Sequence, residues 1–375
     1  MNKNIIALGF VSFFTDMASS MVTTILPLYI VYILNDGVDK LGYILAIATF
    51  ISYGFRILFG YLSDKLQIVK PFVVAGYLVS AITKPLLYFS DTWQSVALLR
   101  GTERIGKAIR SATKDSLISA YSNKKSGKSF GFHKMMDVAG EMSGAIIAFL
   151  ALYYLGKNEE IFRDVFALTL IPGILAVVIV IFFVKDAPFN QKQKTKFDFS
   201  KDYKLLWILG VFFGISFFMM NESFYIIKAK EAGYLITYIP LLVILLNLIQ
   251  TLSSYFFGLK IDKFGSKNII FISFLLGLVS LIFLYFDFII IGFILLGLFS
   301  VSSLNGIRSY ISNNAYNKAT IYGVFYGGIA VSSSLGSITF GIIWQYFGEN
   351  YAIIFSILGV SLISFIFRSI LWNKS

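Results

Sequence analysis

The sequence predicts an all-α membrane protein with twelve transmembrane helices in two pseudo-symmetric six-helix bundles. Hydrophobic residues make up 57% of the 375-residue chain and charged residues only 14%, whereas soluble domains carry about 25% charged residues. Apolar runs long enough to cross a bilayer, about 20 residues each, recur twelve times along the chain. Polar residues of the first half also recur at constant spacing in the second half.

The twelve predicted spans follow each other closely along the chain. The first begins like a signal peptide, but Asp16 interrupts its apolar run, which resumes as far as Ile33, so we expect an uncleaved helix. In order, the spans are 5–34, 41–63, 69–89, 93–120, 128–155, 161–184, 204–230, 233–259, 267–286, 288–312, 320–347 and 350–371.

The longest polar interruption runs from Lys185 to Lys204 and contains six lysines and three aspartates. It predicts an N-terminal half over 1–184, a linker over 185–204 and a C-terminal half over 205–375. Lysine and arginine residues are concentrated in the loops on the linker side, and positive loops stay in the cytoplasm. We therefore expect both termini and the linker to be cytoplasmic, in a bacterial inner (plasma) membrane.

Composition also excludes several kinds of site. The chain has no cysteine and a single histidine, His133, which excludes a disulfide framework and a metal centre built from cysteine or histidine. No nucleophile with a placed base is evident, so we expect neither an enzyme nor a bound cofactor. The net charge of +12 is explained by loop lysines, and no nucleic-acid partner is expected.

An internal repeat relates the two halves. Three residues at the end of the second span and directly after it recur 198 residues later: Gly60, Asp64 and Lys65 correspond to Gly258, Asp262 and Lys263. Arg110 recurs as Arg308 at the same offset. Gly131, Gly144 and Gly156 recur 192 residues later as Gly323, Gly336 and Gly348. Two parallel six-helix repeats with a binding site at their interface are typical of secondary transporters.

These residues resemble the major facilitator superfamily (MFS) over essentially the whole chain. The loops after spans 2 and 8 resemble its motif A, and Arg100 with Gly106 resembles motif B. Gly131, Gly140 and Gly144 resemble the antiporter motif C, although Ala145 stands where proline is expected. The stretches 14–16, 100–107 and 131–137 are similar to one bacterial subgroup without an assigned substrate, in which a glutamate usually replaces Ser20. The resemblance implies alternating access, with helices 1, 4, 7 and 10 lining a central cavity.

The fourth span carries a stripe of charged residues on one helical face, between Arg100 and Lys114. Charges in a membrane span normally face a bundle interior or a hydrated cavity. The stripe can bind an anionic group of a substrate, or it can be neutralised internally by the face that carries His133, Asp137 and Glu141. The predicted substrate and proton cavity contains Asp16, Ser20, Arg100, Glu103, Arg104, Asp137, Glu141, Glu222, Asn305 and Arg308.

Asp16 and Glu222, one in each half, are the candidates for proton coupling; alternatively, each only pairs with an arginine. A cytoplasmic gate is predicted at Gly60, Asp64, Lys65, Arg110, Gly258, Asp262 and Lys263, although the lysines can also act only as topology determinants. His133 is expected to be a buried hydrogen-bonding residue. Lys84 is expected near the external end, with its ammonium group reaching the interface.

The function predicted from these residues is secondary active transport of a small organic solute, which can be anionic. We expect coupling to protons, a monomer in the lipid bilayer, and export because of the partial motif C. The alternatives are an uncoupled facilitator or exchanger, and a membrane receptor or scaffold that transports nothing.

Overall fold

The computed structural model describes residues 2–66, 68–121, 126–186, 202–316 and 318–372, and every regular element in these ranges is a helix. Eleven segments within them are long and apolar enough to span a membrane. The helix α4 (Trp93–Tyr121) is long enough at 29 residues but carries the charged stripe and so is less apolar. With α4 as the twelfth span, the predicted fold class is confirmed.

The first compact unit contains the first six spans together with Leu235–Leu241. Its helices are α1 (Lys3–Leu28), continued by a π-helical segment (Tyr29–Ile33), α2 (Val38–Leu66), α3 (Lys70–Thr83), continued by a 3-10 segment (Pro85–Phe89), α4, α5 (Ser126–Tyr154), α6 (Glu159–Leu168) and α7 (Leu170–Phe183). The second unit contains α8 (Tyr203–Phe218), α9 (Glu222–Glu231), most of α10 (Ile239–Phe264), α11 (Ser266–Tyr285), α12 (Ile289–Asn314), α13 (Lys318–Phe347) and α14 (Glu349–Trp372). A short 3-10 segment (Ile236–Tyr238) precedes α10. Most of the predicted linker, residues 187–201, lies outside the described residues, so its boundaries stay a prediction.

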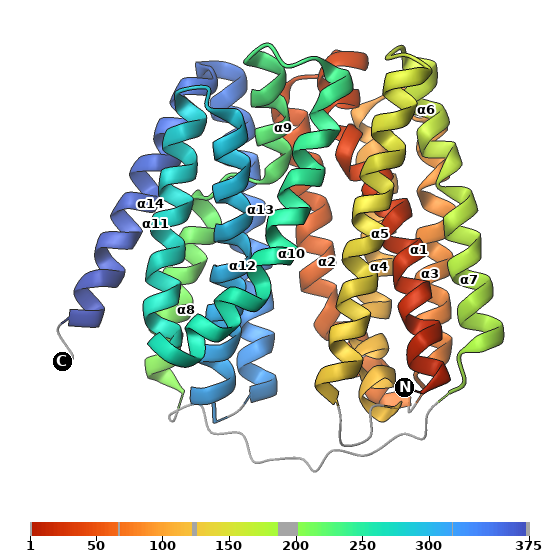
Figure 1. Cartoon of the computed structure of the whole chain (residues 1–375), viewed down its shortest axis with the longest axis horizontal. Coiled ribbons are helices and arrows are strands. Elements are labelled where there is room, and N and C mark those ends of the chain that lie inside the picture. The colour runs from red at the N-terminus through yellow and green to blue at the C-terminus, as the bar shows by residue number, and fades with distance from the viewer. Residues whose placement is uncertain (1, 67, 122–125, 187–201, 317, 373–375) are drawn as a thin grey trace. The chain divides into compact units, whose positions relative to one another are not determined.

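The helix pairs within each unit repeat the same pattern (Figure 1). In the first unit α1 packs against α5 and α7, and α3 packs against α4 and α7. In the second unit α8 packs against α13 and α14, and α11 packs against α12 and α14. The paired helices occupy the same positions in the order of spans in each half, as expected from the internal repeat.

The seventh span differs from the prediction of one continuous helix over 204–230. It is broken into α8 and α9 at Met219–Asn221, where the backbone of Met219 becomes extended. The Asn221 side chain accepts a hydrogen bond from the Ser223 amide at 2.9 Å and so caps α9. The first turn of α9 therefore begins within the span, and Glu222 is its first residue.

Glycines allow close contact at equivalent helix pairs. A Cβ atom at Gly140 or Gly144 of α5 would collide with the carbonyl oxygens of Phe13 or Met17 on α1, and one at Gly336 of α13 would collide with that of Phe217 on α8. Backbone lies directly against the glycine at each point, so no flexible side chain can give way. Small residues of this kind are the usual means of close helix packing in membranes.

Replacing Gly336 with alanine is expected to lower the stability by about 1–3 kcal/mol, because the methyl group forces α13 away from α8. The matched control is Gly327→Ala on the same helix, where an added Cβ meets no atom within 4 Å. Alanine there is expected to be neutral or slightly stabilising, because alanine has a higher helix propensity than glycine. Thermal unfolding of the two purified variants in detergent tests this, and equal unfolding temperatures would contradict it.

Candidate functional site

A strongly polar cavity of about 170 Å³ lies within the first unit, between α1, α3, α4 and α5. Charged side chains in membrane-spanning helices normally face a bundle interior or a hydrated cavity and commonly mark functional sites, so this cavity is a candidate binding site. Its eleven lining residues are Ser12, Thr15, Asp16, Tyr77, Lys107, Arg110, Ser111, Lys114, Lys134, Asp137 and Glu141.

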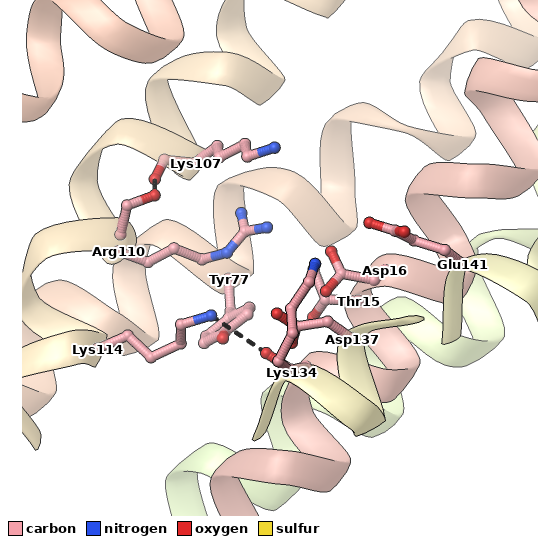
Figure 2. A pocket seen from close by; sticks show the side chains of 11 residues that line it. Thr15, Asp16, Tyr77, Lys107, Arg110, Lys114, Lys134, Asp137 and Glu141 are labelled. Carbon is pink, nitrogen blue, oxygen red and sulfur yellow. Dashed lines mark hydrogen bonds between the residues drawn. The ribbon is translucent and has the colours of Figure 1, made fainter. Parts of the chain in front are cut away.

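One wall of the cavity is basic and comes from α4 (Figure 2). Lys107, Arg110 and Lys114 share a helix face because they are three and four residues apart. The Arg110 guanidinium donates a hydrogen bond to Ser80 Oγ at 2.9 Å and lies 4.8 Å from the centre of the Tyr77 ring. These contacts with α3 hold the buried arginine in place beside the cavity.

The opposite wall carries carboxylates from two helices (Figure 2). Asp16 comes from α1, whereas Asp137 and Glu141 come from successive turns of α5, with Lys134 beside them. The close contact at Gly140 and Gly144 holds α5 against α1, which brings the three carboxylates to one side of the cavity.

A chain of polar contacts runs along the edge of the cavity. Lys114 Nζ donates a hydrogen bond to Ser12 Oγ at 3.2 Å, and Ser12 Oγ lies 2.8 Å from His133 Nε2. The other ring nitrogen, His133 Nδ1, lies 3.3 Å from Asp137 Oδ1. The Ser12–His133 contact is a hydrogen bond, whereas His133 and Asp137 are within ion-pair distance only. His133 is buried, in agreement with its expected role as a hydrogen-bonding residue.

The two walls face one another without direct ion pairs between their central residues. In the part of the chain that the structure describes, no nitrogen of Lys107 or Arg110 lies within 4.0 Å of a carboxylate oxygen of Asp16 or Glu141. The charges are therefore separated by the space of the cavity. Among the described residues, no group of three His, Cys, Asp or Glu side chains could hold a metal ion.

Several residues predicted for the cavity lie elsewhere in the first unit. Arg100 pairs with Glu103 at 2.9 Å, and both side chains are almost completely buried. Arg104 Nε lies 3.4 Å from the same Glu103 carboxylate oxygen. Ser20 is buried against Gly144 of α5. The three charged residues pair with one another within α4, and none of the four lines the cavity.

The prediction for Lys84 is wrong, because its side chain does not reach an interface. Lys84 is only 2% exposed, and its ammonium group donates a hydrogen bond to the Thr15 carbonyl oxygen at 3.2 Å. The sequence places this lysine at the end of a span, where long cations commonly reach water. The structure instead uses it to join α1 to the end of α3, next to Asp16.

The predicted cavity residues of the C-terminal half belong to the second unit. Glu222 is half-buried at the start of α9, where an acidic side chain is favoured by the helix dipole. Asn305 is half-buried on α12. Arg308, on the same helix, is exposed and donates a hydrogen bond to the Tyr326 hydroxyl at 3.3 Å.

The predicted gate residues lie at helix ends, except for Arg110. Gly60 and Lys65 are near the end of α2, and Gly258, Asp262 and Lys263 are near the end of α10. Asp262 and Lys263 are exposed, whereas the side chain of Asp64 lies outside the described residues. Arg110 contacts α3 and lines the cavity instead, so the gate network remains a prediction.

The predicted set did not include seven of the lining residues, namely Ser12, Thr15, Tyr77, Lys107, Ser111, Lys114 and Lys134. Lys107 and Lys114 belong to the charged stripe of α4, and Lys134 is three residues before Asp137 on the same face of α5. Their spacing could have identified them. The uncharged residues carry no comparable signal in the sequence, because uncharged polar residues are frequent in membrane helices; they are Ser12, Thr15, Tyr77 and Ser111.

Comparison with known proteins gives matches over most of the chain. The family model of the Major Facilitator Superfamily matches residues 8–248. The uncharacterized MFS-type transporter MJ1317 of Methanocaldococcus jannaschii is 32% identical, over 96% of this chain and 93% of that one. Uncharacterized protein Rv2265 of Mycobacterium tuberculosis is 22% identical, over 81% of this chain and 77% of that one.

Solved structures share the fold. The nucleoside transporter NupG superimposes with a TM-score of 0.79 at 14% identity, over 99% of both chains. The D-xylose-proton symporter superimposes with a TM-score of 0.71 at 17% identity, over 97% of this chain and 96% of that one. Together with the apolar helices, the family match and the similarity to MJ1317 show that this multi-pass membrane protein belongs to the Major Facilitator Superfamily.

Proposed function

We propose that this transporter moves a small organic solute by proton-coupled alternating access, and that the cavity between α1, α3, α4 and α5 is its substrate and proton site. The observation that carries the proposal is the cavity itself. Three carboxylates and four cations converge there from spanning helices, and ionisable groups in such helices commonly mark substrate pathways and proton relays.

Asp16 and Glu141 are the proposed proton-binding groups. Both line the cavity and are half-buried, and neither is within ion-pair distance of Lys107 or Arg110, as described above. Asp137 differs because His133 already contacts it. Glu222 remains the candidate in the C-terminal half, where it begins a helix inside a broken span, a common construction at transporter sites.

The remaining features of the proposal follow from the sequence. Both termini and the linker over 185–204 are placed in the cytoplasm, between halves over 1–184 and 205–375, in a plasma membrane. The residues after α2 and α10 act as the cytoplasmic gate. Export is proposed from the partial glycine motif of α5, and the working unit is a monomer.

Proton flux in proteoliposomes tests the coupling. The purified protein is reconstituted with a pH-sensitive dye inside the vesicles, and a deproteinised cell extract is added outside. We expect proton movement that depends on both the extract and the protein. Solute exchange that is insensitive to an imposed pH gradient would overturn the coupling and favour the uncoupled facilitator or exchanger.

A further inference from the structure

We infer that the cavity binds a small zwitterion, a solute that carries one anionic group and one ammonium group. This inference rests on the proposed role of the cavity as the substrate site, and it specifies the chemical class of the substrate. It goes beyond an anionic solute, which the charged stripe of α4 alone would predict.

The charges of the cavity are sorted by wall. Lys107, Arg110 and Lys114 give the α4 wall a formal charge of +3. The opposite wall has three carboxylates and Lys134, so its formal charge is −3 + 1 = −2. The sum is only +1, but the two signs are on opposite sides (Figure 2). A ligand with both charges can complement both walls at once.

The basic wall is held ready for an anionic group. Arg110 is fixed by Ser80 and Tyr77, so its guanidinium is positioned before any ligand binds. Guanidinium and ammonium groups bind carboxylate or phosphate oxygens through strong charge-assisted hydrogen bonds. A carboxylate next to Lys107 and Arg110 would gain such bonds from side chains that already line the cavity.

The acidic wall discriminates against a simple anion. An anion without an ammonium group would face a wall whose formal charge stays −2 even with Lys134 counted. A simple amine would in turn face Lys107 and Arg110. Specificity of this kind comes from repulsion as well as attraction. Only a solute with both groups avoids both penalties.

The size of the cavity supports a small solute. Its volume of about 170 Å³ is below the roughly 300–1,000 Å³ typical of sites for drug-sized ligands. Molecules of amino-acid size are small enough to fit. A bulky hydrophobic compound is neither small enough nor complementary to these walls.

Matched sets of solutes provide the test. Binding to the full-length protein in lipid nanodiscs is measured by calorimetry for leucine, isocaproate and isoamylamine, and for γ-aminobutyrate, butyrate and butylamine. In each set the first compound is the zwitterion, and the others lack either the ammonium or the carboxylate. We expect at least one zwitterion to bind about tenfold more tightly than both of its partners, the effect of one charge-assisted hydrogen bond.

Variants show whether the two walls are responsible. Asp16→Asn is expected to reduce the preference for the zwitterion over the matched acid, whereas Lys107→Gln is expected to weaken binding of both. The control is Asp164→Asn, an exposed aspartate on α6, which should bind as the unaltered protein does. A monodisperse peak in size-exclusion chromatography confirms that each variant is folded.

The result that overturns the inference is an acid or an amine that binds as tightly as its zwitterion, or no binding by either zwitterion. This failure is distinct from failure of the proposed function, because the binding assay contains no proton gradient. Zwitterion binding without coupled proton flux would remove only the coupling. Coupled flux with the extract but no zwitterion binding would remove only this inference.

Discussion

Replacing Asp16 with asparagine is expected to abolish proton-coupled transport while the protein stays folded. Asparagine has nearly the same shape as aspartate, and the Asp16 side chain lines the cavity, so the substitution leaves helix packing intact. It removes the group that would take up a proton. Removal of a positioned proton-transfer group commonly costs about 100-fold or more in rate, and we expect a loss of that size in gradient-driven flux.

The measurement is the initial rate of solute-dependent proton flux in proteoliposomes, normalised to the amount of reconstituted protein. Glu141→Gln is expected to behave in the same way, with the exposed Glu160→Gln on α6 as its matched control. Glu222→Gln tests the candidate of the C-terminal half. If Asp16→Asn and Glu141→Gln both retain normal gradient-driven flux, these carboxylates do not couple transport to protons.

Replacing Glu103 with glutamine is expected to cause the largest loss of stability. Glu103 is the only acidic residue between Arg100 and Arg104, and the Arg100–Glu103 pair is almost completely buried. Loss of its charge would leave buried guanidinium groups without compensation. Breaking a buried ion pair by removing one partner typically costs about 3–5 kcal/mol, so we expect a low yield and a markedly lower unfolding temperature in detergent.

Glu141→Gln is the matched comparison for this experiment. Both substitutions remove one carboxylate from a spanning helix, but Glu141 faces the cavity and Glu103 faces other side chains. The free energy of unfolding of Glu141→Gln should therefore be within about 1 kcal/mol of that of the unaltered protein, as expected for a residue outside a packed ion pair. Similar unfolding temperatures for the two variants would contradict the structural role of Glu103.

Much of this architecture could be predicted because bilayer thickness constrains the sequence so strongly. Each span must supply about 20 mostly apolar residues, and most described helices begin or end within a few residues of the predicted bounds. The break at Met219–Asn221 was not predicted, because the span as a whole is strongly apolar. Its local signals were the capping Asn221 and the acidic Glu222 directly after it.

The candidate site could be predicted only in part. The stripe of α4 indicates that charges gather inside the protein, but helix spacing allows Glu103 to pair with either Arg100 or Lys107. Packing decides between them, since Arg100 and Glu103 are buried together while Lys107 faces the cavity. Lys84 illustrates the same point, because its partner is a backbone carbonyl on a helix 69 residues earlier in the chain.

The glycine contacts between α1 and α5 determine which helices of the first unit can move relative to each other. The backbones of α5 and α1 are in direct contact at Gly140 and Gly144. We therefore expect α1 and α5, which carry Asp16 and Glu141, to move together as one rigid unit. The α4 helix instead packs mainly on α2 and α3 and makes few contacts with α1 and α5. Any change in the width of the cavity therefore has to come from movement of α4 relative to α1 and α5. A bound solute that contacts both sides would restrict this movement.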